Sequence, residues 1–241
     1  GVEKVIAVGS GKGGVGKSTV AVNLAISLAG LGARVGLLDG DIYGPSIPIL
    51  LGLKNETPKL DEVRRKILPL SAHGISCVSM GFLLKSSDAV VWRGPMLGKA
   101  LQQFVDDVDW GELDYLVVDL PPGTSDSPLT VMQTLPMDGF VVVSTPQELA
   151  IIDARRCINM IRKLNLNVLG IVENYTGEIF GEGAGKKLAK EVDAPFLGNL
   201  ALRASYQDNS KPTTLSDSSV GKEYSELVKA VKAVEASSDP H

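Results

Sequence analysis

The chain has 241 residues, of which 44% are hydrophobic and 22% charged, a composition typical of a folded globular protein rather than a disordered one. Its formal net charge of −4 disfavours non-specific binding to nucleic acid or anionic lipid. No apolar run approaches the ~18 residues of a transmembrane helix, and the 2 cysteines cannot form a disulfide framework. We therefore expect a cytoplasmic protein whose partners are neither nucleic acid nor a membrane.

Short β-branched apolar runs alternate with longer helical stretches along the chain. In chain order, the expected strands are residues 5–8, 35–38, 115–118, 140–143, 168–172 and 195–200, and the clearest helices are residues 18–31 and about 220–236. The strand runs are continuously apolar, as parallel strands covered on both faces are. The predicted fold class is therefore α/β, a doubly wound and mostly parallel sheet with helices on both faces. We expect residues 1–241 to form a single domain.

Three segments add detail to this alternation. Residues 55–80 are interpreted as an insertion that carries extra strands, such as residues 74–79. The polar face of the last helix mixes lysines with glutamates, which favours packing on the sheet over lying on a membrane surface. The tail, residues 237–241, is expected to be disordered.

The strongest motif lies between the first strand and the first helix. It reads Gly11-Lys12-Gly13-Gly14-Val15-Gly16-Lys17-Ser18-Thr19 and matches the P-loop pattern G-x-x-x-x-G-K-[ST]. The glycines let consecutive backbone N–H groups turn toward phosphate oxygens, and the following helix presents its positive end to the same anion. We expect all nine residues to bind ATP, with Lys17 at the β- and γ-phosphates and the Ser18 hydroxyl on Mg²⁺.

Acidic residues follow two further predicted strands. Asp39 and Asp41 come after the second strand, at the carboxyl edge where open α/β sheets bind ligands. Asp41 is the candidate to hold Mg²⁺ and to orient or deprotonate the attacking water, with Asp39 in support. Asp119 ends another apolar strand in the Walker B arrangement, which holds Mg²⁺ directly or through water. The Gly123 amide just beyond is expected to sense the γ-phosphate.

The second lysine of the loop, Lys12, is typical of the deviant Walker A class. The motif resembles that of dimeric ATPases of the septum-positioning, plasmid-partitioning and nitrogenase-reductase type. This resemblance implies that Lys12 crosses to the nucleotide of a partner subunit and acts there like an arginine finger.

Further segments make the resemblance more specific. Residues 39–48, 91–96 and 119–126, taken with the P-loop, resemble the Mrp (ApbC-like) family of P-loop ATPases, which is implicated in iron–sulfur cluster carriage and assembly. The similarity extends over nearly the whole chain. It implies a homodimer with nucleotide at the interface, in which Asn174 and the backbone near residues 200–202 contact adenine.

The chain departs from this family in one loop. Family members usually carry a Cys-Pro-x-Cys segment before an Ile-Phe-Gly sequence, whereas here Val172-Glu173-Asn174 leads directly to Tyr175-Thr176-Gly177-Glu178-Ile179-Phe180-Gly181. Two cysteines per chain in that loop would supply four thiolates across a dimer, enough for one [4Fe–4S] cluster. Cys77 in a strand-like run and Cys157 at helical spacing are interpreted as core residues. The usual cluster ligands are therefore missing.

Two functions are consistent with these patterns. The first is a slow, Mg-ATP-dependent homodimeric ATPase that carries iron–sulfur clusters or assists their assembly, with an iron–sulfur scaffold or apo-protein clients as partners. The alternative is a nucleotide-gated, dimerising module that recruits another protein, hydrolyses ATP slowly and binds no cluster; the missing cysteines favour this over direct cluster carriage. A GTPase is disfavoured, because Asn174-Tyr175-Thr176-Gly177 lacks the N-K-x-D pattern for guanine.

Overall fold

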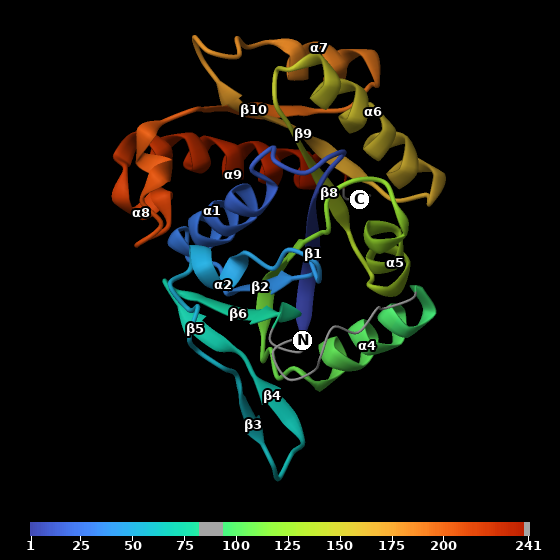
Figure 1. Cartoon of the computed structure of the whole chain (residues 1–241), viewed down its shortest axis with the longest axis vertical. Helices are drawn as coiled ribbons and strands as arrows, with labels where there is room; N and C mark the ends of the chain where they lie inside the picture. Colours follow the sequence, from blue (N-terminus) through green and yellow to red (C-terminus); the bar gives the residue numbers. More distant parts are fainter. Residues whose placement is uncertain (82–93, 239–241) are drawn as a thin grey trace.

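A mostly parallel sheet organises the chain (Figure 1). The computed structural model describes residues 1–81 and 94–238, so part of the motif at residues 91–96 lies outside the described residues. Within them, eight strands form one sheet in the order β10-β9-β8-β1-β7-β2-β6-β5, and only the β5–β6 pair is antiparallel. The strands are Val2–Ser10 (β1), Val35–Asp39 (β2), Leu70–Ala72 (β5), Ile75–Ser79 (β6), Leu113–Asp119 (β7), Gly139–Ser144 (β8), Val168–Thr176 (β9) and Phe196–Ala201 (β10).

Helices cover both faces of the sheet, which confirms the predicted doubly wound α/β fold (Figure 1). One face carries α1 (Lys17–Gly30), α2 (Ile47–Leu50), the short α8 (Thr213–Ser216) and α9 (Ser218–Ser238). The other carries α4 (Gly94–Asp107), α5 (Asp126–Thr134), α6 (Glu148–Lys163) and α7 (Ala184–Glu191), and a 3₁₀ turn follows β10 at Ala204–Gln207. Successive residues of β1 pack into the two hydrophobic cores in turn. Ile6 and Val8 belong to the core that contains α1 and α9, whereas Ala7 belongs to the core on the other face of the sheet, as expected for side chains that alternate across a strand.

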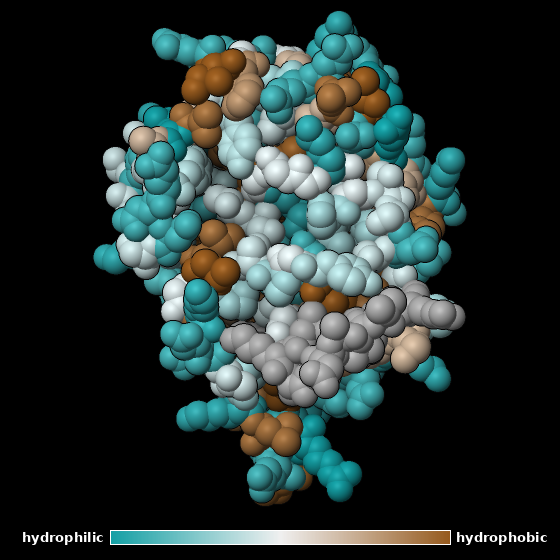
Figure 2. Space-filling model, viewed as in Figure 1, coloured by the Kyte–Doolittle hydropathy of each residue, from teal (hydrophilic) through white to brown (hydrophobic). Residues whose placement is uncertain are grey.

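The segment 55–80 is more than an insertion. β6 lies parallel to β2, pairing Gly36 with Ser76 and Asp39 with Ser79, so it is an integral strand of the main sheet. Only β3 (Lys59–Asp61) and β4 (Lys66–Leu68) form a separate antiparallel hairpin, which projects at the bottom of Figure 1. Figure 2 shows hydrophobic surface on this hairpin, where the side chains of Leu60 and Val63 are 62% and 94% exposed.

The last helix continues further than the sequence predicts. The hydroxyls of Ser237 and Ser238 donate to the Val234 carbonyl at 2.8 and 2.9 Å, and both residues belong to α9. These two residues of the predicted tail thus continue the helix. Residues 239–241 lie outside the described residues. None of the helices in the described part of the chain is long and apolar enough to cross a membrane.

Strand order and register bring the candidate residues to one edge. β7 lies between β1 and β2, and Asp119 at its end pairs with Val8 on one side and Asp39 on the other. The loop after β1 therefore runs directly beside Asp119 and Asp39. This is the carboxyl edge at which open α/β sheets bind their ligands.

Candidate functional site

The P-loop connects β1 to α1 in a conformation that requires glycine at two positions. Gly14 and Gly16 have φ values of +79° and +81°, a left-handed region that L side chains disfavour. Gly16 is the N-cap of α1, and no side chain caps the helix and no acid lies in its first turn. The free N–H groups at the start of α1 therefore point toward the loop and favour an anion there.

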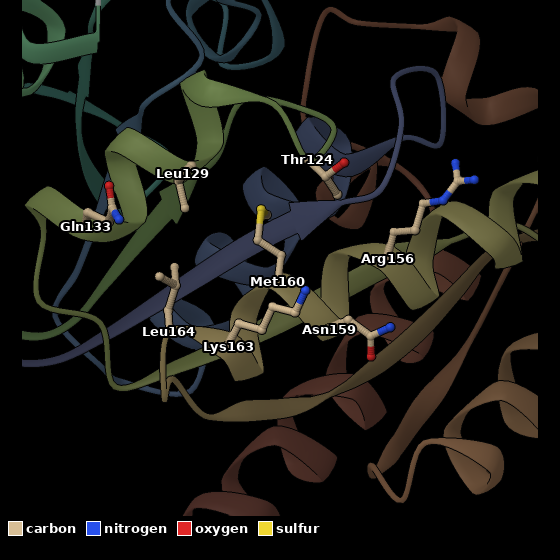
Figure 3. A pocket seen from close by; sticks show the side chains of 8 residues that line it. All are labelled: Thr124, Leu129, Gln133, Arg156, Asn159, Met160, Lys163 and Leu164. Carbon is tan, nitrogen blue, oxygen red and sulfur yellow. The ribbon is translucent and has the colours of Figure 1, made fainter.

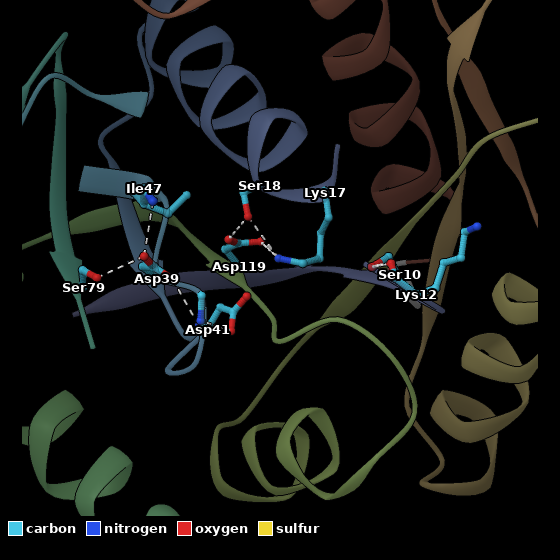
Figure 4. Close-up of polar contacts among 10 residues, drawn as sticks. Ser10, Lys12, Lys17, Ser18, Asp39, Asp41, Ile47, Ser79 and Asp119 are labelled. Carbon is cyan, nitrogen blue, oxygen red and sulfur yellow. Dashed lines mark hydrogen bonds and ion pairs between the residues drawn. The ribbon is translucent and has the colours of Figure 1, made fainter. Parts of the chain in front are cut away.

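Lys17, Ser18 and Asp119 form one buried network beneath the loop (Figure 4). The Ser18 hydroxyl donates to Asp119 Oδ2 at 2.6 Å, and the Lys17 ammonium donates to Ser18 Oγ at 3.2 Å and to Asp119 Oδ1. Asp119 is fully buried, and this burial raises the pKa of its carboxyl despite the nearby Lys17 charge. The predicted P-loop lysine, the predicted metal-binding hydroxyl and the Walker B carboxylate are thus in direct contact.

The two aspartates that follow β2 have different surroundings. Asp39 is completely buried and accepts hydrogen bonds from the Ser79 hydroxyl at 3.0 Å and from the backbone of Asp41 and Ile47 at 3.1 and 3.3 Å. Its burial, and then the charge of Asp119, raise the pKa of Asp39 to about 7. Asp41 instead lies at the cavity described below and accepts from the Gly44 amide at 3.1 Å. Asp39 therefore holds the loop that presents Asp41.

Lys12 lies apart from this network. Its side chain is half-buried and points away from Lys17 and Asp119 (Figure 4), while its backbone carbonyl accepts from the Ser10 hydroxyl at 2.8 Å. Within residues 1–81 and 94–238, none of the ion pairs involves its ammonium. The geometry leaves this charge available to a group that is not part of the same chain.

The two remaining candidates both contact the P-loop strand or the loop itself. Gly123 has a φ of +92°, and its amide donates to the Ser10 carbonyl at 2.9 Å, so it would have to leave that carbonyl to reach a phosphate. Asn174 is buried at the end of β9, and its side-chain amide donates to the Val15 carbonyl at 2.9 Å. Both positions are beside the loop, and their roles toward γ-phosphate and adenine stay predictions.

A cavity of about 310 Å³ opens over these groups. Its lining includes eight predicted residues, Lys12, Gly13, Gly14, Gly16, Lys17, Ser18, Thr19 and Asp41. It also includes Ser10, Ser46, Leu50, Pro122 and Tyr175, which were not predicted as site residues. Asp41 lines this cavity, and Asp119 contacts Lys17 and Ser18, which also line it. The carboxylate of Asp119 and the hydroxyl of Ser18 are hard oxygen donors that fit Mg²⁺, and the glycine loop at the start of α1 fits a phosphate chain.

Glu173 is a structural residue that the sequence reasoning missed. It is fully buried next to Asn174, and its carboxylate accepts the amides of Gly183 at 2.7 Å and of Gly185. These amides begin α7, so Glu173 supplies the negative charge that a helix N-terminus favours. In the sequence, the signal for this role is an acidic residue near the end of an otherwise apolar strand.

Two glycines with nearly the same φ allow a matched test of the loop. A Cβ at position 14 would meet open space, whereas one at position 16 would overlap the amide of Asn174 and come within 2.9 Å of the Tyr175 hydroxyl. We expect Gly14→Ala to destabilise the nucleotide-free protein by about 1 kcal/mol and Gly16→Ala by at least about 1 kcal/mol more, because it breaks the Asn174 hydrogen bond. Urea unfolding measures both, and equal losses would contradict the packing of Asn174 on the loop.

Both cysteines are core residues, as predicted. Cys77 on β6 and Cys157 on α6 are free and buried, and they belong to the cores on opposite faces of the sheet. They cannot ligate a common metal group within one chain. In the part of the chain that the structure describes, no group of three or more histidine, cysteine or acidic side chains is arranged to hold a metal ion.

Known proteins resemble the chain over most of its length. A family model described as a NUBPL iron-transfer P-loop NTPase matches residues 1–233. An iron-sulfur cluster carrier protein of Pseudomonas fragi is 47% identical over 230 residues, which are 90% of this chain and 80% of that protein. A protein of the same name from Synechocystis sp. is 49% identical over 214 residues, 83% of this chain but only 61% of its own length.

A solved structure shows the same architecture. A nucleotide-binding protein from Archaeoglobus fulgidus in complex with ADP has a TM-score of 0.77 and 37% sequence identity, and the match covers 90% of this chain and 89% of that one. These findings confirm the family resemblance that residues 11–19 and 119–126 predict.

Proposed function

Because the chain belongs to the NUBPL iron-transfer P-loop NTPase family, we propose that it is a slow Mg-ATP-dependent homodimeric ATPase that assists the transfer or assembly of iron–sulfur clusters. The observation that carries the nucleotide half is the buried contact of Lys17 and Ser18 with Asp119 at the start of α1. The cluster half is supported by the name of the relatives, iron-sulfur cluster carrier protein. Residues 1–241 would serve as a single ATPase domain.

Nucleotide binding would redistribute the charges beneath the loop. Ser18 and Asp119 would hold Mg²⁺, which neutralises phosphate charge when it is bound. Lys17, now paired with Asp119, would turn to the β- and γ-phosphates. The Gly123 amide would exchange the Ser10 carbonyl for a phosphate oxygen, and Asp41 at the cavity would orient the attacking water.

Dimerisation would complete the site. Lys12 lines the cavity, and none of the ion pairs among the described residues involves its ammonium. In a face-to-face dimer it would reach the nucleotide of the other subunit and stabilise negative charge there. Asn174, already packed on the loop, would contact adenine in its own subunit.

The cysteines favour an accessory role in cluster chemistry. Buried thiols on opposite faces of the sheet cannot present thiolates at a shared surface. We therefore propose that a scaffold or an apo-protein client supplies the ligands of the cluster, and that ATP binding by this chain drives or times the transfer.

Two assays test the two halves of this function separately. The first measures Mg-dependent ATP hydrolysis by the purified chain, and no hydrolysis above background would overturn the nucleotide half. The second follows anaerobic transfer of a cluster from a preloaded scaffold to an apo-protein, which we expect the chain to accelerate only with Mg-ATP. Unchanged transfer rates, with hydrolysis intact, would overturn the cluster half alone.

Reconstitution with iron and sulfide tests the accessory role. We expect the dimer to retain far less than one cluster, and the Cys77→Ala/Cys157→Ala variant to retain no less than wild type. A stable cluster that is lost in the double variant would contradict the assignment of both cysteines to the core.

The reactivity of the thiols gives a further prediction. Burial raises the pKa of Cys157 to about 12 and raises the pKa of Cys77 as well, so only about one thiol in ten thousand is ionised at pH 8 for a pKa of 12. We expect Ellman's reagent to label the native protein very slowly at pH 8 and to detect both cysteines after unfolding in guanidinium chloride. Fast labelling of the native protein would show that a thiol reaches the surface.

A further inference from the structure

A groove of about 530 Å³ lies between α5 and α6 (Figure 3). Leu129 of α5, Met160 of α6 and Leu164, the residue just after α6, supply its apolar lining. Thr124 and Arg156 lie toward one end of the groove, and Gln133 and Leu164 toward the other (Figure 3). It is separate from the cavity over the P-loop and shares none of the residues that line that cavity.

The charge of the groove is opposite to that of the chain. Among the described residues, its ionisable lining residues are Arg156 and Lys163, two helical turns apart on α6, whereas the chain has a net charge of −4. Arg156 bonds Asp153 on its own helix at 2.9 Å but stays 67% exposed. Lys163 is exposed. Apolar side chains beside two cations fit a ligand that carries both apolar groups and carboxylates.

Both walls of the groove touch the nucleotide site. On the α6 side, Gly11 of the P-loop packs so closely on the helix that a Cβ there would overlap the Asp153 carbonyl. On the α5 side, Thr124 follows Gly123, whose amide donates to the Ser10 carbonyl, and α5 begins two residues later at Asp126. A shift of either contact on nucleotide binding would change the groove at its Thr124 end.

We propose that this groove docks an acidic amphipathic segment of a partner protein and that ATP binding changes the affinity for this segment. The apolar residues of the segment lie over Met160 and Leu164, and its carboxylates lie toward Arg156 and Lys163. A segment fits better than a small anion, because the two cations and the apolar lining are spread along the helix rather than gathered at one point. The docking does not depend on iron–sulfur chemistry; its dependence on ATP rests on the nucleotide half of the proposed function.

A labelled peptide provides the probe. It has about twelve residues, with leucines at i and i+4 spacing flanked by glutamates, and its control has lysines in place of the glutamates. By fluorescence anisotropy we expect wild type to bind the acidic peptide at least about tenfold more tightly than the control. Equal binding of the two peptides would overturn the proposal.

A pair of charge-matched variants locates the site. Arg156→Glu/Lys163→Glu is expected to weaken binding of the acidic peptide at least about tenfold. Lys222→Glu/Lys232→Glu makes the same change in net charge on exposed positions of α9, on the opposite face of the sheet, and should alter binding by less than about twofold. Equal losses in both variants would show a general charge effect and overturn the docking site.

Two further arms complete the test. A non-hydrolysable ATP analogue with Mg²⁺ is expected to change the affinity for the peptide about fivefold or more; an unchanged affinity, with the analogue itself bound, would overturn the dependence on ATP. Citrate tests the groove as a small-anion site. Citrate binding that is lost in Arg156→Glu/Lys163→Glu, without peptide binding to wild type, would overturn the docking of a protein segment.

Discussion

Replacing Lys17 with methionine is expected to weaken Mg-ATP binding at least about a hundredfold and to destabilise the nucleotide-free protein by about 3 kcal/mol. The ammonium contacts Asp119, which is fully buried, and methionine keeps the packing of the stem but not the charge. Asp119 is then left as an unpaired buried carboxylate. Urea unfolding and binding of a fluorescent ATP analogue measure the two effects.

The second substitution of a double-mutant cycle separates binding from stability. Asp119→Asn removes the carboxylate, so Lys17→Met/Asp119→Asn should regain most of the lost stability but none of the ATP binding. Burial already raises the pKa of Asp119, so the Lys17→Met deficit should shrink as the pH falls, because a protonated carboxyl needs no cation. A deficit that is independent of pH and persists in the double variant would contradict the buried ion pair.

Replacing Lys12 with alanine is expected to lower the rate of ATP hydrolysis by about a thousandfold or more, the effect of losing a cation that is supplied across an interface. Nucleotide binding to the single chain should change little, because the ammonium points away from Lys17 and Asp119. The comparison therefore separates kcat from nucleotide affinity. Steady-state hydrolysis and equilibrium binding of the same variant measure both.

Mixing two inactive variants shows whether Lys12 acts in the other subunit. A Lys12→Ala chain keeps its own nucleotide site, and a Lys17→Met chain keeps its Lys12. Their mixture should regain hydrolysis, because the second chain supplies the missing cation to the first. Replacing the second chain with Lys12→Ala/Lys17→Met is the matched control and should restore none; recovery with that control would contradict action across the interface.

The central part of the fold and site follows from local patterns. Buried parallel strands are apolar along their whole length, so β1, β2, β7 and β8 could be predicted within a few residues. The P-loop could be predicted because its chemistry fixes its residue types. The positive φ values of Gly14 and Gly16 favour glycine, and a bound phosphate favours a cation such as Lys17 beside the start of the helix. Because parallel strands end at the same edge of a sheet, the expected parallel sheet also places Asp39 and Asp119 at one edge, the carboxyl edge.

Other features depend on contacts that no local pattern encodes. The sequence predicts a strand at residues 74–79 but not its place beside β2 in the main sheet, where Asp39 accepts the Ser79 hydroxyl and Cys77 is buried against the helices of one face. The hydrogen bond from Gly123 to Ser10 and the role of Glu173 at the start of α7 arise between segments far apart along the chain. The amino-acid types in these segments would be the same whether or not the segments were in contact, so the sequence alone does not predict the contacts.

The position of β1 in the middle of the sheet has a consequence for how the protein is made. Both neighbours of β1, the strands β7 and β8, begin more than a hundred residues later, at Leu113 and Gly139. A growing chain therefore exposes the P-loop strand with two unpaired edges until β7, more than a hundred residues further along, has left the ribosome. ATP cannot stabilise such an intermediate, because Asp119 is not yet beside Lys17. Nucleotide should instead bind and stabilise only the chain whose sheet is complete, so that it contributes to stability only in the last steps of folding.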